Sequence, residues 1–190
     1  MDSEAFTRLV ESGKESVSLE FKISQNWSTL KFKIIRCILA MSNTRGGGTL
    51  IVGIDDEGNL LGVEPEHHST FKENEIRDLL ANFSDPYVDF DLHLVEYSDK
   101  KYIVFLIREF SFVPVICKRN GPDLKAGVVY VRTRNRRPES AAISDFAHMR
   151  ELIVLAVDKG RGSLRGRGWR HENEPEVEKK YEKEVADLNL

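Results

Sequence analysis

Two groups of acidic residues are placed where a hydrolytic metal site could form. Glu15 precedes a short segment of alternating polarity, Glu20 lies within it, and Asp55-Asp56-Glu57 directly follows an apolar run. Clustered carboxylates can hold Mg²⁺ or Mn²⁺, because these hard ions prefer oxygen ligands, and a bound ion can activate water to cleave a phosphodiester. Three of these acids could meet in such a site. The alternative is that Glu20 is a solvated strand residue and Asp55-Asp56 part of an ordinary turn.

Residues 17–23, which include Glu20, predict a β-strand with one solvated face. Leu19 and Phe21 point to one side of it, whereas Glu20 and Lys22 point to the other. Because positions 15 and 20 differ by an odd number, their side chains would face opposite sides of a continuous strand. Glu15 must therefore lie before the strand or beyond a bulge.

The other elements follow from the periodicity of apolar residues. Spacings of three and four predict helices, and alternating or short continuous apolar runs predict strands. The predicted helices span residues 3–13, 28–41 with Ser28 as the N-cap, 71–83 and 144–158. The predicted strands span residues 17–23, 49–54, 60–63, 88–97, 102–110, 113–118 and 127–133, with a hairpin turn at 98–101. The predicted fold class is α/β, more closely α+β, with a mixed β-sheet of about five to six strands flanked by three to four helices.

The length of the chain allows one domain and a tail. With 190 residues, of which 41% are hydrophobic, the chain can fill a single core. We expect the domain to span residues 1–158 and the tail residues 159–190. The tail has an Arg/Gly-rich stretch around Trp169, which we expect to be flexible, and then a mixed-charge run that is at best a marginal solvated helix. Arg/Gly-rich segments bind RNA loosely or act as solubilising linkers.

Bulk charge and cysteine content limit the class of protein. The formal net charge is −3 although 31% of residues are charged, so a nucleic-acid surface would have to be a local patch. Cys37 and Cys117 lie eighty positions apart, which fits neither a disulfide framework nor a zinc site, and two buried reduced thiols fit a cytoplasmic protein. The sequence has no signal-like start and no apolar stretch of about 20 residues, so we expect no membrane partner.

Positive charge concentrates late in the chain, in the last predicted strand and the loops beside it. Tyr130, Arg132 and Arg134 alternate onto one face, where an aromatic ring could stack on a base beside phosphate contacts. The alternative is an ordinary solvated strand face. The predicted nucleic-acid-binding residues are Lys22, Lys118, Arg119, Tyr130, Arg132, Arg134, Arg136 and Arg137.

The glycine run Gly46-Gly47-Gly48 does not predict a nucleotide site. A phosphate-binding P-loop has a Lys-Ser/Thr pair right after its last glycine and then a helix, whereas here Thr49-Leu50 and a strand follow. The run instead predicts a helix stop with positive φ. We therefore expect no nucleotide cofactor.

Four segments together resemble a known family. They are Glu15–Lys22, Ile38–Gly47, Leu50–Gly58 and Val129–Arg134. Their types and order resemble the Schlafen AlbA-like domain family over roughly residues 1–158, in a single-lobe form. In ribonuclease members of that family, two glutamates and an aspartate form a metal-dependent site that cuts structured RNA such as transfer RNA.

The resemblance implies roles for individual residues. The metal ligands would be Glu15, Glu20 and one of Asp55 and Asp56, with Asp56 preferred as the catalytic aspartate. Lys22 would neutralise a phosphate or the charge of the transition state, or is a plain cation on the strand face. Nucleases of the animal type join two such lobes and carry a Cys/His zinc site, whereas this chain has one lobe and too few cysteines. We therefore expect no zinc.

We accordingly predict a nucleic-acid-binding domain that acts as a metal-dependent endoribonuclease. Its cofactor would be Mg²⁺ or Mn²⁺, and its partner RNA of the transfer-RNA type, or DNA. A non-catalytic DNA- or RNA-binding regulatory module with the same fold is the alternative. A further alternative is a self-associating interaction protein whose charged tail recruits a partner. A homodimer could rebuild a two-lobed groove, since two-fold dimers are the commonest oligomers.

Overall fold

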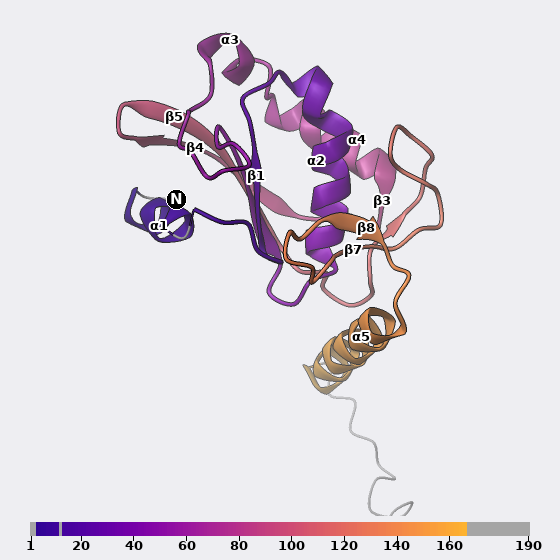
Figure 1. Ribbon diagram of the computed structural model, residues 1–190. Helices are drawn as coiled ribbons and strands as arrows, with labels where there is room; N and C mark the ends of the chain where they lie inside the picture. Colours follow the sequence, from indigo (N-terminus) through magenta and orange to yellow (C-terminus); the bar gives the residue numbers. More distant parts are fainter. Residues whose placement is uncertain (1–2, 12, 167–190) are drawn as a thin grey trace, which may run out of the picture.

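The centre of the fold is a four-stranded mixed sheet in the order β1-β2-β5-β4. The computed structural model describes residues 3–11 and 13–166 (Figure 1). The strands of this sheet are β1 (Leu19–Lys22), β2 (Gly48–Val52), β4 (Phe90–Tyr97) and β5 (Lys100–Ile107). β1 pairs in parallel with β2, and the other pairs are antiparallel. β2 lies between two neighbours and is almost entirely buried, as its continuous apolar sequence predicts.

Helices pack on both faces of this sheet. α1 (Ser3–Val10) covers one face, where Phe6 contacts the rings of Tyr97 and Tyr102. α2 (Trp27–Ser42) crosses the other face and supplies most of the larger core. The remaining helices are α3 (Pro65–His68), α4 (Glu73–Phe83) and α5 (Phe146–Gly166). Among the described residues, no helix has the length and apolar content needed to cross a membrane.

Two short sheets complete the fold. β3 (Ser84–Asp85) pairs with β6 (Ile116–Cys117), and β7 (Tyr130–Arg132) pairs with β8 (Ser140–Ala142). We call β7, β8 and the joining residues 133–139 the ribbon, and residues 133–139 its tip. The ribbon lies across α2, and its tip reaches the edge of the main sheet at β1 (Figure 1).

The predicted α+β fold class is confirmed, but the strands predicted for one sheet form a four-stranded sheet and two separate two-stranded sheets. The late strands are only two or three residues long, and Pro114 before β6 and Pro138 before β8 cannot donate hydrogen bonds that would extend the ladders. The predicted strand at 60–63 is wrong, since only an isolated bridge between Ile54 and Leu60 forms there. The sheet therefore has four strands, and the others form separate pairs.

Local turn and cap chemistry explains where elements begin and end. The hairpin between β4 and β5 is confirmed, and Ser98 and Asp99 have φ of 49° and 57°, as a two-residue type I′ turn requires. The N-cap of α2 is Asn26 rather than Ser28, because the Asn26 side chain accepts from Thr29 N at 3.0 Å. Positive φ in the glycine run is confirmed at Gly46 and Gly47.

The last helix is longer than its sequence pattern predicted. α5 runs to Gly166 rather than ending at Asp158, so the expected tail begins as a continuation of the helix. The rest of that tail, with Trp169 and the mixed-charge run, falls on residues 167–190 and lies outside the described residues.

Candidate functional site

Glu20 is buried, although the strand pattern predicted a solvated face. It is 9% exposed. One oxygen of its carboxylate contacts the Lys22 ammonium, and the other lies 2.5 Å from Nη1 of Arg132. Glu20 pairs in register with the buried Leu50, so its side chain lies on the sheet face that α2 covers. The prediction of a wet face is therefore wrong, because the ribbon covers the edge of β1 and brings a cation to the carboxylate.

Arg132 ties the ribbon to the chain before β1. Its side chain is fully buried. Nη2 donates to the carbonyl oxygens of Ser16 and Pro138, both at 3.2 Å, and Nη1 donates to the Ser140 hydroxyl at 3.1 Å. A buried guanidinium is tolerated when it is paired and hydrogen-bonded in this way. Arg132 thus holds the structure together, and its guanidinium presents no surface to a phosphate.

Tyr130 is also an interior residue, with 5% of its surface exposed. Its hydroxyl accepts from Lys125 N at 2.9 Å and donates to the carbonyl of Asp123 at 3.4 Å. The sequence pattern placed Tyr130 and Arg132 on one exposed face of a strand. The structure corrects this expectation, since both side chains point into the protein and the ring is not available to stack on a base.

Glu15 lies beside Glu20 although it is not part of the strand. The chain turns between Ser16 and Leu19, where Ser16 N donates to the carbonyl of Leu19 at 2.9 Å. The Glu15 carboxylate reaches back and accepts from Phe21 N at 2.8 Å. Of the two predicted positions for Glu15, before the strand or beyond a bulge, the structure shows the first, since β1 begins at Leu19. We call Glu15, Glu20, Lys22 and Arg132 the glutamate cluster.

Burial controls protonation in and behind the glutamate cluster. It raises the pKa of Glu15, and the charge of Glu20 adds to this rise, whereas the Phe21 N–H, Lys22 and Arg132 oppose it. Behind the cluster, burial raises the pKa of the Cys37 thiol to about 12, with Glu20 contributing in the same direction. Burial also raises the pKa of Cys117. Both cysteines are free and buried, as expected.

The aspartates expected to join the glutamates are engaged elsewhere or exposed. Asp55 closes the turn after β2: its carboxylate accepts from the backbone N–H groups of Glu57 and Asn59 and from the Asn59 amide, at 3.1, 2.8 and 2.9 Å. These bonds, the Asn59 side chain first, lower the pKa of Asp55. Asp56 is exposed.

These carboxylates do not fit a divalent cation as they are placed. Both oxygens of Glu20 face cations of the protein, and both oxygens of Asp55 are hydrogen-bonded within its turn. Across residues 3–11 and 13–166, no group of three or more His, Cys, Asp or Glu side chains is arranged to hold a metal ion. The structure therefore brings together Glu15, Glu20 and Lys22, but not Asp55 or Asp56.

The remaining basic residues of the predicted interface fall into separate places. Lys118 and Arg119 follow β6, which lies across α2 from the ribbon tip (Figure 1). Nη2 of Arg134 donates to both carboxylate oxygens of Glu151 in α5, at 2.6 and 2.7 Å. Arg136 and Arg137 are exposed at the ribbon tip, and within the described chain neither forms an ion pair or hydrogen bond.

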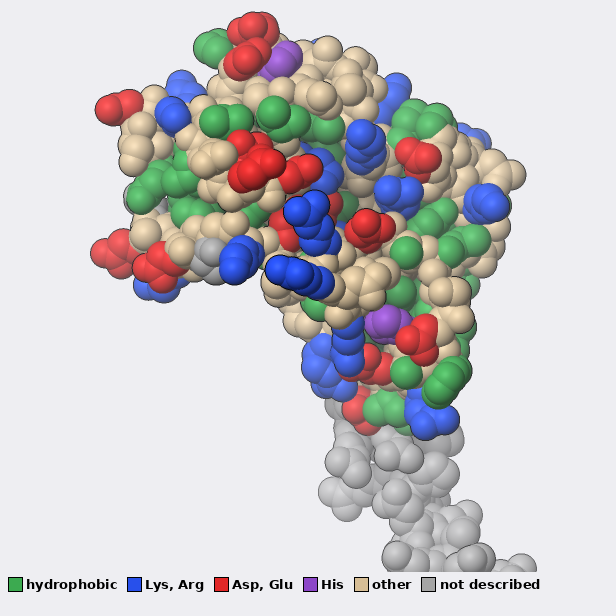
Figure 2. Space-filling model, in the orientation of Figure 1, with side chains coloured by type: hydrophobic (Ala, Val, Ile, Leu, Met, Phe, Trp, Pro, Cys, Tyr) green, Lys and Arg blue, Asp and Glu red, His purple; other side chains and the backbone are tan. Residues whose placement is uncertain are grey.

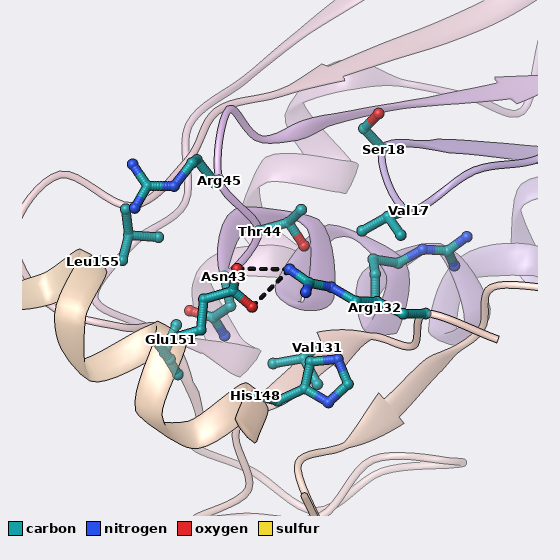
Figure 3. Close-up of a pocket in the computed structure, with 12 residues that line it drawn as sticks. Val17, Ser18, Asn43, Thr44, Arg45, Val131, Arg132, His148, Glu151 and Leu155 are labelled. Carbon is teal, nitrogen blue, oxygen red and sulfur yellow. Dashed lines mark hydrogen bonds and ion pairs between the residues drawn. The ribbon is translucent and has the colours of Figure 1, made fainter. Parts of the chain in front are cut away.

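A pocket of about 280 Å³ lies between the ribbon, α5 and the end of α2. Val17, Asn43, Val131 and Glu151 are among the residues around it (Figure 3). Asn43 is 6% exposed and bonds to three backbone groups: its amide donates to the carbonyls of Val115 and Tyr130 at 2.8 and 2.9 Å, and its oxygen accepts from Val115 N at 2.8 Å. Asn43 thereby fixes β7 to α2.

Two arginines that sequence reasoning left without a role, Arg8 and Arg45, line a neighbouring pocket. A second pocket, of about 520 Å³, shares Ser18 and Arg45 with the first and is also lined by Arg8 of α1. Both arginines are exposed, and neither forms an ion pair among the described residues. Arg45 belongs to the motif that carries the family resemblance, whereas no sequence signal marks Arg8.

Two solved structures resemble this fold. One is the crystal structure of the DIP2311 protein from Corynebacterium diphtheriae, with 18% identity, a TM-score of 0.48 and coverage of 74% of this chain but only 26% of that one. The other is the solution structure of the N-terminal domain of a RecG-related protein from Nitrosomonas europaea, with 18% identity, a TM-score of 0.47 and coverage of 73% and 90%. The chain thus spans about a quarter of the length of the first relative. A comparison with curated proteins gave no match.

The sequence itself matches the family described as Schlafen, AlbA_2. The match covers residues 15–139, which is well over half of the chain and contains the glutamate cluster, the glycine run and the ribbon tip. This match confirms the resemblance noted in the sequence, and the family indicates a nucleic-acid-related domain. The chain belongs to the Schlafen AlbA_2 family.

Proposed function

We propose that this domain binds the phosphate backbone of RNA or DNA through exposed arginines on either side of residues 16–18. The observation that carries the proposal is that Arg136 and Arg137 are exposed at the ribbon tip without a partner in the described chain. The buried Arg132 anchors the ribbon to Ser16, so the tip is held next to β1. Arginine side chains without an acidic partner are available for phosphate oxygens.

Arg8 and Arg45 extend this surface beyond the tip. Ser16 and Ser18 line the same pocket as these two arginines, and Ser16 also accepts from Arg132 at the base of the ribbon. Figure 2 shows several Lys and Arg side chains over the middle of this face, between α1, the ribbon and the end of α2, with Asp and Glu side chains immediately beside them. Exposed arginines gathered locally support binding despite a net charge of −3.

The test compares paired arginine substitutions by their effect on affinity and on its salt dependence. Arg136→Ala/Arg137→Ala and Arg8→Ala/Arg45→Ala should each weaken binding to single-stranded RNA, single-stranded DNA or transfer RNA. Each lost phosphate contact should reduce the slope of log K against log salt by about 0.7–0.9. Arg108→Ala is the matched control, because Arg108 is exposed but ion-paired with Asp89 and Asp91. Unchanged affinity and slope in both double variants would refute the proposed surface.

A metal-dependent endoribonuclease is a second candidate, favoured by the proximity of Glu15, Glu20 and Lys22. It requires Glu20 to exchange its contacts with Lys22 and Arg132 for a metal ion. Its test incubates the protein and transfer RNA with Mn²⁺, Mg²⁺ or EDTA. Glu15→Gln is the informative variant, because glutamine can still accept from Phe21 N. Glu20→Ala would leave the buried Arg132 without its carboxylate, so lost cleavage could then reflect unfolding. Metal-dependent cleavage that Glu15→Gln abolishes would support the enzyme, and binding without cleavage in every condition would exclude it.

A further inference from the structure

α5 carries two apolar faces, and the fold covers only one of them. Leu152 and Leu155 are buried in the core. The outer side of the helix carries five of the twelve large apolar residues that are exposed in the described chain, and Figure 1 shows α5 at the margin of the fold. These five are Phe146, Met149, Ile153, Val154 and Val157, with exposed fractions of 80%, 40%, 55%, 48% and 46%. Contiguous exposed apolar surface of this kind marks an interaction site.

The outer residues form a stripe that begins with the ring of Phe146 and ends at a glycine, which has no side chain. Phe146, Met149, Ile153 and Val157 recur at spacings of three and four, so they share one side of the helix over about three turns. Gly160 continues the same stripe. A Cβ added at Gly160 would have no heavy atom within 4 Å, so the helix surface there is open.

This stripe is complementary to itself when two helices run antiparallel. With a two-fold axis at Ile153, Phe146 of one copy faces Gly160 of the other, Met149 faces Val157, and Ile153 faces its own equivalent. The largest exposed ring then packs over the residue without a side chain, as ridge-into-groove packing favours. We propose that α5 pairs in this antiparallel arrangement with α5 of a second copy of the chain.

The size of the stripe sets the strength of this dimer. Stable protein interfaces bury about 1,200–2,000 Å² in total, and one pair of helices in contact over about three turns lies at or below the lower limit. The dimer is therefore a reversible one, with dissociation in the micromolar range. If the domain also binds nucleic acid as proposed above, pairing would add avidity, but the dimer itself does not depend on that function.

The first test measures the mass of the full chain by sedimentation across micromolar concentrations. The mass should rise from monomer to dimer, and Ile153→Asp should remain monomeric with an unchanged melting temperature in dilute solution. Leu94→Asp is the control, because Leu94 is 49% exposed on β4, away from α5, and should dimerise like the wild type. A wild-type chain that stays monomeric, or an Ile153→Asp chain that dimerises as well as wild type, overturns the proposal.

The second test exchanges the two ends of the stripe. Phe146→Ala and Gly160→Phe should each weaken dimerisation about tenfold or more, and the double variant should restore it, because a ring then again faces a small residue and a restored pair cannot arise from damage to the fold. A double variant no tighter than either single variant contradicts the register. Dimerisation that appears only after residues 167–190 are removed would show that the chain covers this face itself, and it too would overturn the proposal.

Discussion

The base and the tip of the ribbon use the same residue type for opposite purposes. At the base, Arg132 is fully buried against Glu20 and holds the ribbon on β1. At the tip, a few residues along the chain, Arg136 and Arg137 are exposed and have no partner within the described residues. A cluster of arginines in a sequence is therefore not one surface. Its members divide according to whether the fold supplies a buried carboxylate to meet them.

Removing the buried arginine should have the largest effect on stability. Arg132→Met leaves Glu20 buried with only Lys22 as a counter-charge and removes the bonds to Ser16 and Pro138. We expect a loss of about 3–5 kcal/mol in the free energy of unfolding, measured by urea denaturation. Arg137→Ala, at the tip, should change it by less than about 0.5 kcal/mol. Similar losses in both variants would contradict the distinction between base and tip.

Asn43 is the second anchor of the ribbon. Its substitution should cause the next largest loss in the free energy of unfolding. Asn43→Ala leaves the N–H of Val115 and the carbonyls of Val115 and Tyr130 without their partner in a buried place. The expected cost is about 1–3 kcal/mol in the free energy of unfolding. Asn82→Ala is the control, since its amide bonds to the Asp78 carbonyl on the exposed side of α4. A loss in Asn43→Ala no greater than in the control would show that this anchor is dispensable.

Glu15 should make stability depend on pH. Its pKa in the folded protein is raised above the ordinary value of 4.5, chiefly by burial. The folded state therefore holds the proton more tightly than the unfolded chain does. The stabilisation is complete below the ordinary pKa and is lost as the pH rises through the raised value. Glu15→Gln should flatten the fall in the free energy of unfolding over this window, and an equally steep fall in both proteins would count against the assignment.

The smallest effect should come from the exposed pair that joins the ribbon to α5. The side chains of Arg134 and Glu151 are 63% and 44% exposed, although Nη2 of Arg134 makes two short hydrogen bonds to the carboxylate. Solvent screening limits such pairs to about 0–1 kcal/mol. Arg134→Ala should therefore lower the free energy of unfolding within that range, and less so in high salt. A loss as large as that of Arg132→Met would mean that the pair is not solvated in solution.

Much of the fold could be predicted from periodicity alone. The spacing of apolar residues located α2, α4 and the β4–β5 hairpin, because each is long enough to show its repeat. The parity of positions 15 and 20 also predicted that Glu15 and Glu20 do not belong to one continuous strand. These features are local, so the sequence carries them directly.

Burial could not be predicted in the same way. Alternation shows which side chains share a face of a strand, but not which face another segment will cover. Glu20 and Arg132 bury each other although more than a hundred residues separate them in the sequence. Asn43, at the end of α2, likewise bonds to the carbonyl of Tyr130, which is far from it in the sequence. Asp55 is the opposite case: its turn is local, and Gly58 and Asn59 after it are residues that favour such a turn.

The burial of Cys37 behind the glutamate cluster gives the protein an internal reporter. A thiol with a pKa near 12 has almost no thiolate at neutral pH and no access to reagent while the fold is closed. Its labelling by a thiol reagent must wait for the ribbon and α2 to separate, so the labelling rate measures how often that opening occurs. The labelling rate of Cys37 therefore measures how often this region opens, and the labelling rate of Cys117 measures opening on the β3–β6 side independently.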